Sequence, residues 1–245
     1  MSTGKYLPGY SSQVVSFMRR RTAATHAAFF LPYLKPVMRL LDVGCGPGSI
    51  TLDLSRLVAP GEAVGVDLEP KQFSEVQEQA RTEKLNVRFE EGSAYALPFP
   101  DSSFDAAFSH ALVSHLAEPV RALKEIRRVL KPGGLVGLRA GDWGGVLMYP
   151  LTDEVRAGLA RFAEMQRRNG GDPEAGRKLG HYLREAGFVN TRMSASYEIY
   201  DNPAMLFGLA RQIMPETPSP EASGEHRDLF FAQAWCEAVG EVPGS

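Results

Sequence analysis

Short apolar runs alternate with helical patterns along the chain from Met38 to about Ala140. This alternation is typical of strands joined by crossover helices, so it predicts a parallel sheet. The apolar runs are short and continuous, as in strands that are buried on both faces. The strands that we expect cover residues 39–43, 63–67, 87–90, 104–109 and 135–139.

Helices are predicted between and around these strands. Residues 50–58 and 71–84 have helical patterns, and an apolar stripe over residues 120–130 marks a third helix, which ends at Lys131-Pro132-Gly133-Gly134. Upstream, residues 13–34 form one helical stretch. Downstream we expect two helices, a strand, and a last edge or hairpin strand, at residues 152–168, 173–186, 189–200 and 229–239.

The charge of the chain is close to neutral. It has 27 Lys and Arg against 29 Asp and Glu, which gives a net charge of −2. Proteins that bind nucleic acid normally present a dense basic face, so this balance indicates a partner other than nucleic acid. The length of 245 residues suits one domain with a single core and an appended segment.

Cysteine use and hydropathy indicate the compartment. Cys45 and Cys236 are too few for a disulfide framework and form no C-x-x-C pair, which suits a reducing environment. The chain has no apolar run of 18 residues, and its first residues lack the apolar core of a signal peptide. We therefore expect a cytoplasmic protein, monomeric or homodimeric, without stable membrane insertion.

A glycine-rich motif, LDVGCGPG at residues 41–48, lies where the first predicted strand turns into the first helix. Glycines let the backbone approach a ligand closely, and the helix that follows presents free N–H groups. A dinucleotide fingerprint would be G-x-G-x-x-G, but Ser49 occupies the position of its third glycine. Asp42, two residues before the first glycine, suits a ligand with a cationic amino group better than a pyrophosphate.

A second acid, Asp67, ends the second predicted strand, 19 residues after Gly48. A carboxylate at this position can accept hydrogen bonds from both hydroxyls of a ribose. Together with Asp42, it indicates a nucleoside attached to an amino-acid tail, and S-adenosylmethionine is such a molecule.

Four ordered motifs carry a resemblance to a known family: LLDVGCGPGSIT, GVDLEP, ALPFPDSSFDAAFSHAL and IRRVLKPGGLV. The segment from about Leu40 to Leu138 resembles a class I S-adenosylmethionine-dependent methyltransferase, and is similar to the ubiquinone/menaquinone type and its small-molecule relatives. The resemblance implies an enzyme with S-adenosylmethionine as cofactor, S-adenosylhomocysteine as product and a small-molecule acceptor.

The resemblance also implies a fold and a division of the chain. The fold is α/β, with a Rossmann-like, doubly wound, seven-stranded sheet that is mostly parallel and has an antiparallel last strand. An N-terminal helical segment and inserted helices would form a lid. In a single domain, residues 1–36 would be a helical cap, 37–141 the cofactor-binding core, 142–228 the inserted helices and sixth strand of the acceptor pocket, and 229–245 the last strand and tail.

The resemblance assigns roles to individual residues. Asp42 would meet the methionine amino group, through water or through the loop. The backbone of Gly44, Cys45 and Gly46 would line the methionine and sugar, and Asp67 would bind the ribose. Leu68 would pack under the adenine, Ser93 and Ala94 would touch its edge, and His110 would lie beside the sulfonium. Two positions depart from the family pattern. Many relatives have Asp where this chain has Ser93, which weakens the expected adenine contact, and Pro47 replaces a hydroxyl residue that contacts the cofactor.

His110 is the candidate catalytic residue. It follows the fourth predicted strand, where ligands of parallel sheets bind, and His is the usual proton acceptor near neutral pH. The alternative is a cofactor or shape contact without a proton role. No His, Asp, Glu or Cys cluster has metal-ligand spacing, so no metal is expected.

Further residues have both a ligand-binding and a structural interpretation. His115 either contacts substrate or packs the next helix, and Tyr10 and Arg21 either reach the ligand or stabilise helices. Asp142 and Trp143, which follow the fifth predicted strand, either wall an apolar pocket or pack against the inserted helix.

Three other functions remain open from the sequence. A nicotinamide-dependent oxidoreductase would need the G-x-G-x-x-G motif, which is missing. A nucleic-acid methyltransferase commonly has Asn/Asp-Pro-Pro-aromatic after the fourth strand, where this chain has Ser109-His110-Ala111-Leu112. The third possibility is a protein that binds S-adenosylmethionine without turnover.

Overall fold

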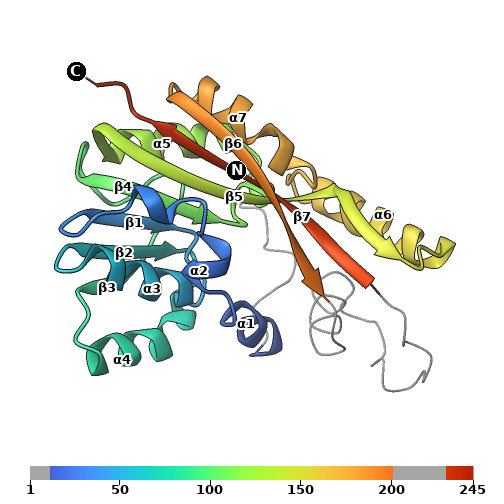
Figure 1. The fold of residues 1–245 in the computed structure, drawn as a ribbon, viewed down its shortest axis with the longest axis horizontal. Helices are drawn as coiled ribbons and strands as arrows, with labels where there is room; N and C mark the ends of the chain where they lie inside the picture. Colours follow the sequence, from blue (N-terminus) through green and yellow to red (C-terminus); the bar gives the residue numbers. More distant parts are fainter. Residues whose placement is uncertain (1–11, 201–229, 245) are drawn as a thin grey trace.

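A seven-stranded sheet organises the protein in the computed structural model, which describes residues 12–200 and 230–244 (Figure 1). The strand order is β3-β2-β1-β4-β5-β7-β6. Only β7 runs antiparallel to its neighbours, so the predicted Rossmann-like α/β class is confirmed. The strands are β1 (Arg39–Val43), β2 (Glu62–Asp67), β3 (Val87–Glu91), β4 (Phe104–His110), β5 (Leu130–Tyr149), β6 (Val189–Tyr200) and β7 (Phe230–Glu241).

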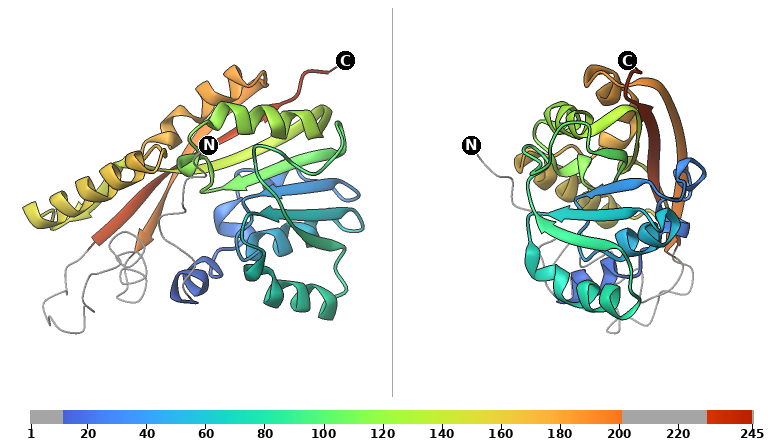
Figure 2. Two further views of the ribbon diagram at one scale, coloured as in Figure 1. Left: turned by 180° about the vertical axis from the view of Figure 1, so that it is seen from behind. Right: turned by 90° about the vertical axis from the view of Figure 1, so that its left-hand side faces the viewer.

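Helices cover both faces of the sheet. Seen from behind, α5 and α7 lie over one face of the sheet, while α2 and α3 pack on the other (Figure 2). None of the helices within the described ranges is long and apolar enough to cross a membrane. The helices are α1 (Ser12–Met18), α2 (Ala23–His26), α3 (Ser49–Val58), α4 (Ser74–Thr82), α5 (Pro119–Val129), α6 (Asp153–Arg168) and α7 (Ala175–Glu185), with 3-10 turns η1 (Leu31–Tyr33), η2 (Pro70–Phe73) and η3 (Val113–His115).

The parallel core forms because its strands are apolar on both sides. In β1 all residues after Arg39 are buried, including Leu40 on one face and Leu41 on the other, which belong to two different apolar clusters. Strands buried in this way need helices on both faces, which the crossover connections supply. As a result β1, β2 and β4 point their carboxyl ends to the same edge of the sheet, and this edge carries the candidate site.

The fifth and last strands differ from the prediction. β5 does not end at Arg139 but continues to Tyr149, because β7 pairs with it on both sides of a register shift between Asp142 and Leu147. For residues 229–239 we expected an edge or a hairpin strand. β7 lies between β5 and β6, so the edge alternative is wrong and β6 is the edge strand, while β7 does pair antiparallel with β6, the strand before it in the chain. The long β5, β6 and β7 extend beyond the parallel core, with α6 alongside the extension (Figure 1).

The predicted helix over residues 13–34 is divided into α1, α2 and η1. The break lies at Thr22, whose backbone is extended (φ −124°, ψ 159°) and whose hydroxyl bonds that of Thr25 at 2.8 Å. Such local hydrogen bonds compete with a continuous helix. Phe30 anchors the segment on the sheet, because its fully buried ring packs over Gly137 of β5, where any Cβ would overlap the ring.

Candidate active site

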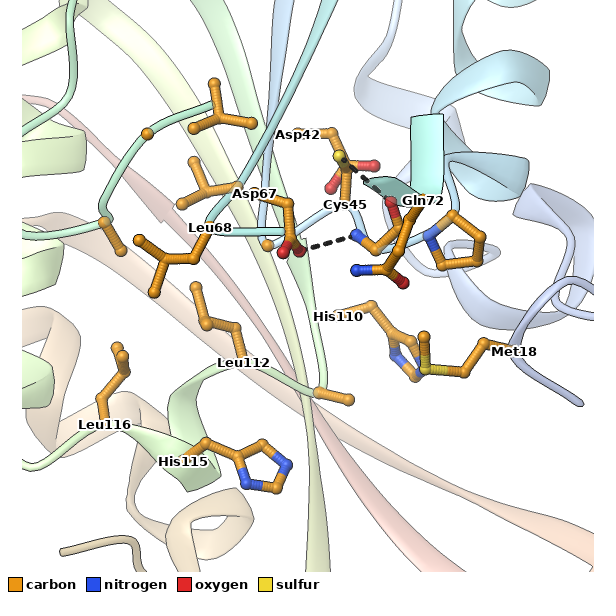
Figure 3. A pocket seen from close by; sticks show the side chains of 18 of the residues that line it. Met18, Asp42, Cys45, Asp67, Leu68, Gln72, His110, Leu112, His115 and Leu116 are labelled. Carbon is orange, nitrogen blue, oxygen red and sulfur yellow. Dashed lines mark hydrogen bonds between the residues drawn. The ribbon is translucent and has the colours of Figure 1, made fainter. Parts of the chain in front are cut away.

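A pocket of about 290 Å³ opens at the carboxyl ends of β1, β2 and β4. Its walls are the glycine-rich loop, the ends of these strands, η3 and the end of α1, as Figure 3 shows for many of the lining side chains. The structure brings together the nine residues that the sequence assigned to the cofactor site or to catalysis. Asp42, Gly44, Cys45, Gly46, Asp67, Leu68, Ser93, Ala94 and His110 all line this pocket.

The glycine-rich loop turns tightly against the neighbouring strand. The N–H groups of Gly44 and Cys45 both donate to the carbonyl of Val66, at 2.8 and 3.1 Å. Gly46 has a positive φ of 54°, and a Cβ there would point at the Met18 methyl group 3.4 Å away. Glycine therefore leaves the loop backbone accessible from the pocket, under the end of α1.

Asp67 is fixed by two backbone hydrogen bonds. Its Oδ2 accepts from the N–H of Gly46 at 2.9 Å and its Oδ1 from the N–H of Glu69 at 3.1 Å. Burial raises the pKa of Asp67, and these bonds offset part of the increase. Each carboxylate oxygen has a second lone pair, so both can still accept from a vicinal diol, the group that a ribose presents.

Asp42 lies deeper, with 2% of its surface exposed. The Thr51 hydroxyl, in the first turn of α3, donates to its Oδ2 at 2.6 Å. Burial raises the pKa of Asp42 to about 7, although the Thr51 bond lowers it. A cationic amino group bound nearby would favour the ionised carboxylate and restore a lower pKa.

Cys45 does not have the properties of a nucleophile. Burial raises the pKa of its thiol well above the usual value, and the negative charges of Asp42 and Asp67 act in the same direction. The thiol is therefore protonated at neutral pH, whereas nucleophilic attack requires the thiolate.

His110 closes the other end of the pocket as the last residue of β4. Its ring packs on Trp235 with centroids 4.8 Å apart and meets the ring of His26 edge-on at 5.1 Å. Within residues 12–200 and 230–244, neither of its ring nitrogens has a hydrogen-bond partner. Burial lowers the pKa of His110 well below its usual value, and the positive charges of Arg21 and Arg139 lower it further, so the ring is neutral.

His115 lies at the end of η3 and also lines the pocket. Burial lowers the pKa of His115 to about 4, with a smaller contribution from Arg21. Both histidines of the pocket are therefore uncharged at neutral pH.

Gln72 was missed by the sequence reasoning. It is buried at 4% exposure, lines the pocket near Gly46, and neither atom of its amide has a hydrogen-bond partner among the described residues (Figure 3). Buried amides are normally paired, so this one points to a ligand in the pocket. Its place five residues after Asp67 was the available signal, but a helical pattern alone does not show which way the side chain faces.

Two residues predicted near the site lie outside the pocket. Asp142 is inside β5 and binds the Arg177 guanidinium through two bonds of 2.6 Å. Trp143 packs on Phe162 of α6 with ring centroids 4.7 Å apart, which is the second of its two predicted roles. Arg21 lines the pocket, whereas Tyr10 is outside the described residues.

The donor set fits a nucleoside attached to an amino acid. Asp67 offers acceptors for a diol, and Asp42 offers an acceptor for an ammonium group. Gln72 adds an unpaired amide. The N-cap of α3 is Gly48, which has no side chain to cap the helix, so the first N–H groups of α3 are available to a carboxylate. Leu68, an apolar side chain 60% exposed at the rim, provides a surface for a base. S-adenosylmethionine has all of these groups.

Comparisons with known proteins agree with this donor set. A family described as methyltransferase domain matches residues 41–138. An uncharacterized methyltransferase of Schizosaccharomyces pombe is 36% identical over 200 residues, which cover 78% of this chain and 72% of that protein. A demethylmenaquinone methyltransferase of Deinococcus radiodurans is 37% identical over 115 residues, 47% of this chain and 46% of that protein. The solved structure of the YcgJ protein from Bacillus subtilis has the same fold, with a TM-score of 0.64 at 18% identity over 95% of this chain and 99% of that one.

Sequence and structure thus converge on one family. The yeast relative matches most of its own length and most of this chain, and the matched motifs build the walls of the pocket. The nicotinamide alternative is therefore set aside, and S-adenosylmethionine is the cofactor. The chain belongs to the class I S-adenosylmethionine-dependent methyltransferases.

Proposed function

We propose that this enzyme transfers the methyl group of S-adenosylmethionine to an oxygen, nitrogen or carbon atom of a small-molecule acceptor. The observation that supports this proposal best is the lining of the pocket beyond the glycine-rich loop. That end is enclosed mainly by apolar or uncharged side chains, a lining that suits a small organic molecule. The side chains are Met18, His110, Leu112, His115 and Leu116, with Arg21 as the charged group.

The residues of the chain act mainly by positioning. The bound cofactor supplies an activated methyl group on a sulfonium. Asp67 would hold the ribose, Asp42 the amino group, and the glycine-rich loop the part between them, while His110 lines the other end of the same pocket. Leu112 and Leu116 exclude water from the acceptor. Methyl transfer gains most of its rate from such alignment and desolvation.

For His110 we favour a contact role over that of a strong base. A neutral imidazole with unpaired nitrogens can donate or accept one hydrogen bond to the acceptor or the cofactor. Its lowered pKa makes it a weak proton acceptor at neutral pH.

The division of the chain is part of the same proposal. Residues 1–36 would cap the cofactor, as the contact of Met18 over Gly46 suggests, and residues 142–228 would complete the acceptor pocket, to which Asn169 contributes. We propose that the enzyme works in the cytoplasm as a monomer or homodimer, without a nucleic-acid partner. Free Cys45 and Cys236 and the net charge of −2 are in keeping with this.

A labelling experiment tests the acceptor class. The protein is incubated with radiolabelled S-adenosylmethionine and cell extract, and the label is separated into small-molecule, nucleic-acid and protein fractions. We expect it in the small-molecule fraction, and to be lost with Asp67→Ala but not with Asp101→Ala, which changes an exposed carboxylate away from the pocket lining. Label in nucleic acid would contradict the proposal, and no transfer to any fraction would favour a binding protein.

A further inference from the structure

The charges of the pocket are divided between its two ends. Only three formally charged side chains occur among its described lining residues: Arg21, Asp42 and Asp67. The two aspartates belong to the cofactor end, where they bind the first turn of α3 and the glycine-rich loop. Arg21, between α1 and α2, acts instead on the pKa values of the residues at the acceptor end, His110 and His115. The acceptor therefore meets a single cation and no anion from the lining.

The Arg21 guanidinium forms no ion pair within 4 Å in the described part of the chain, although its charge acts on Glu198 as well as on the two histidines. Nearby Arg19 forms an ion pair with Glu75, but no such pair involves Arg21 in residues 12–200 and 230–244. The charge of Arg21 contributes to the lowered pKa of Glu198. The carboxylate of Glu198 lies closer to other partners, with one oxygen 3.5 Å from His26 Nε2 and the other 4.0 Å from the Arg139 guanidinium. As far as the described residues go, no ion pair separates this cation from a ligand in the pocket that it lines.

The groups around the acceptor end are also poor proton acceptors. His110 is surrounded by Arg21 before α2, His26 of α2, Arg139 of β5 and Trp235 of β7, which are cationic or uncharged. His115, on the other side, is likewise neutral. A hydroxyl group bound here would find no strong base to remove its proton.

We propose that the acceptor is an apolar molecule with an acidic phenol or enol that is already ionised when it binds, and that Arg21 holds this oxygen and selects the acceptor. This inference rests on the proposed methyl transfer. The oxygen lone pair forms the new C–O bond, and the C–S bond breaks with its electron pair left on sulfur. One negative and one positive charge cancel, and no proton is released. Cancellation of charge is favoured in a pocket of low polarity.

Binding of 4-nitrophenol, which is yellow only when ionised, tests the proposal. Its affinity is measured at pH 8 with and without S-adenosylhomocysteine and compared with that of 4-nitroanisole, its non-ionisable methyl ether. The variants are Arg21→Gln, Arg21→Lys and, as the matched control, Arg20→Gln, which removes an exposed neighbouring cation outside the pocket lining. The affinity for S-adenosylhomocysteine and the melting temperature of each variant verify folding and test the proposed function separately.

We expect the wild type to bind 4-nitrophenol in its yellow form and more tightly than 4-nitroanisole. Arg21→Gln should lose roughly tenfold or more of the affinity for 4-nitrophenol, the effect of one charge-assisted hydrogen bond, and keep that for 4-nitroanisole. Arg21→Lys should lose less, and Arg20→Gln nothing. Equal binding of both probes, or unchanged binding by Arg21→Gln, would overturn the proposal. A loss of S-adenosylhomocysteine affinity alone would assign Arg21 to the cofactor carboxylate and would also overturn it.

Discussion

Burial of Asp42 should make the free protein less stable as the pH rises, and Asp42→Asn should remove this loss. The pKa of Asp42 is raised from 3.8 to about 7 in the folded protein, so its protonated form is favoured there. The contribution of Asp42 to the free energy of unfolding is fully present below its pKa in the unfolded chain. It decreases as the pH rises above that value, and the loss is complete once the pH has passed the pKa in the folded protein. Asn is uncharged in both states, and its side-chain oxygen can still accept the Thr51 hydrogen bond.

The magnitude follows from the same shift. Each pH unit between the two pKa values costs the wild type about 1.36 kcal/mol of unfolding free energy relative to Asp42→Asn. From pH 5 to pH 7 the loss is therefore about 3 kcal/mol, and above pH 7 the difference between the two proteins is constant. Urea unfolding of both proteins between pH 5 and pH 8.5, without cofactor, measures it.

Asp105→Asn is the matched control for this measurement. Asp105 accepts from the N–H of Arg39 at 2.8 Å and from Lys131 at 2.5 Å, and its pKa is lowered. It is ionised in both states above pH 5, so its variant should lose a constant amount of stability across the range. A difference between Asp42→Asn and wild type that stays constant or shrinks as the pH rises would refute the assignment of Asp42 as a buried, weakly ionised carboxylate.

Three further outcomes are expected. The affinity of the wild type for S-adenosylhomocysteine should rise by up to about tenfold from pH 6 to pH 8 in calorimetry, because the cofactor ammonium needs ionised Asp42, and Asp42→Asn should not show this rise. The His110 imidazole should stay neutral from pH 8 down to pH 5.5, so a histidine resonance that His110→Ala removes should not titrate in NMR spectra over this range. Gly46→Ala should lower stability by about 1–2 kcal/mol, because φ is 54°, and should also weaken cofactor binding, because the new methyl group would contact Met18 in the pocket lining. Gly133→Ala, also at positive φ but with open space around it, should lower stability and leave cofactor affinity unchanged.

The cofactor half of the site was predictable from local spacing. The loop at Gly44 and Gly46 and the acid at Asp67 follow short apolar runs, and the rule that parallel strands bind ligands at their carboxyl ends brings them together. In the structure each of these residues lines the same pocket, and their role in binding stays a prediction.

Features that depend on distant pairing were not predictable. The segment after Arg139 contains Gly141, Gly144 and Gly145, which in a sequence suggest a loop, yet it is strand because residues of β7 about ninety positions later pair with it. Gln72 could not be identified either. The 3-10 turn η2 directs its amide into the pocket, where it has no partner among the described residues, and hydropathy does not show in which direction a side chain points.

Binding of S-adenosylmethionine is assigned to Asp67 and the glycine-rich loop. Calorimetric titration of the wild type, Asp67→Ala and Asp101→Ala with S-adenosylhomocysteine and with NAD tests it directly. We predict that the wild type and Asp101→Ala bind S-adenosylhomocysteine equally and do not bind NAD. Asp67→Ala, which lacks acceptors for two hydroxyls, should bind it at least about tenfold more weakly. Binding of NAD, or equal affinity of Asp67→Ala and wild type for S-adenosylhomocysteine, would contradict this assignment.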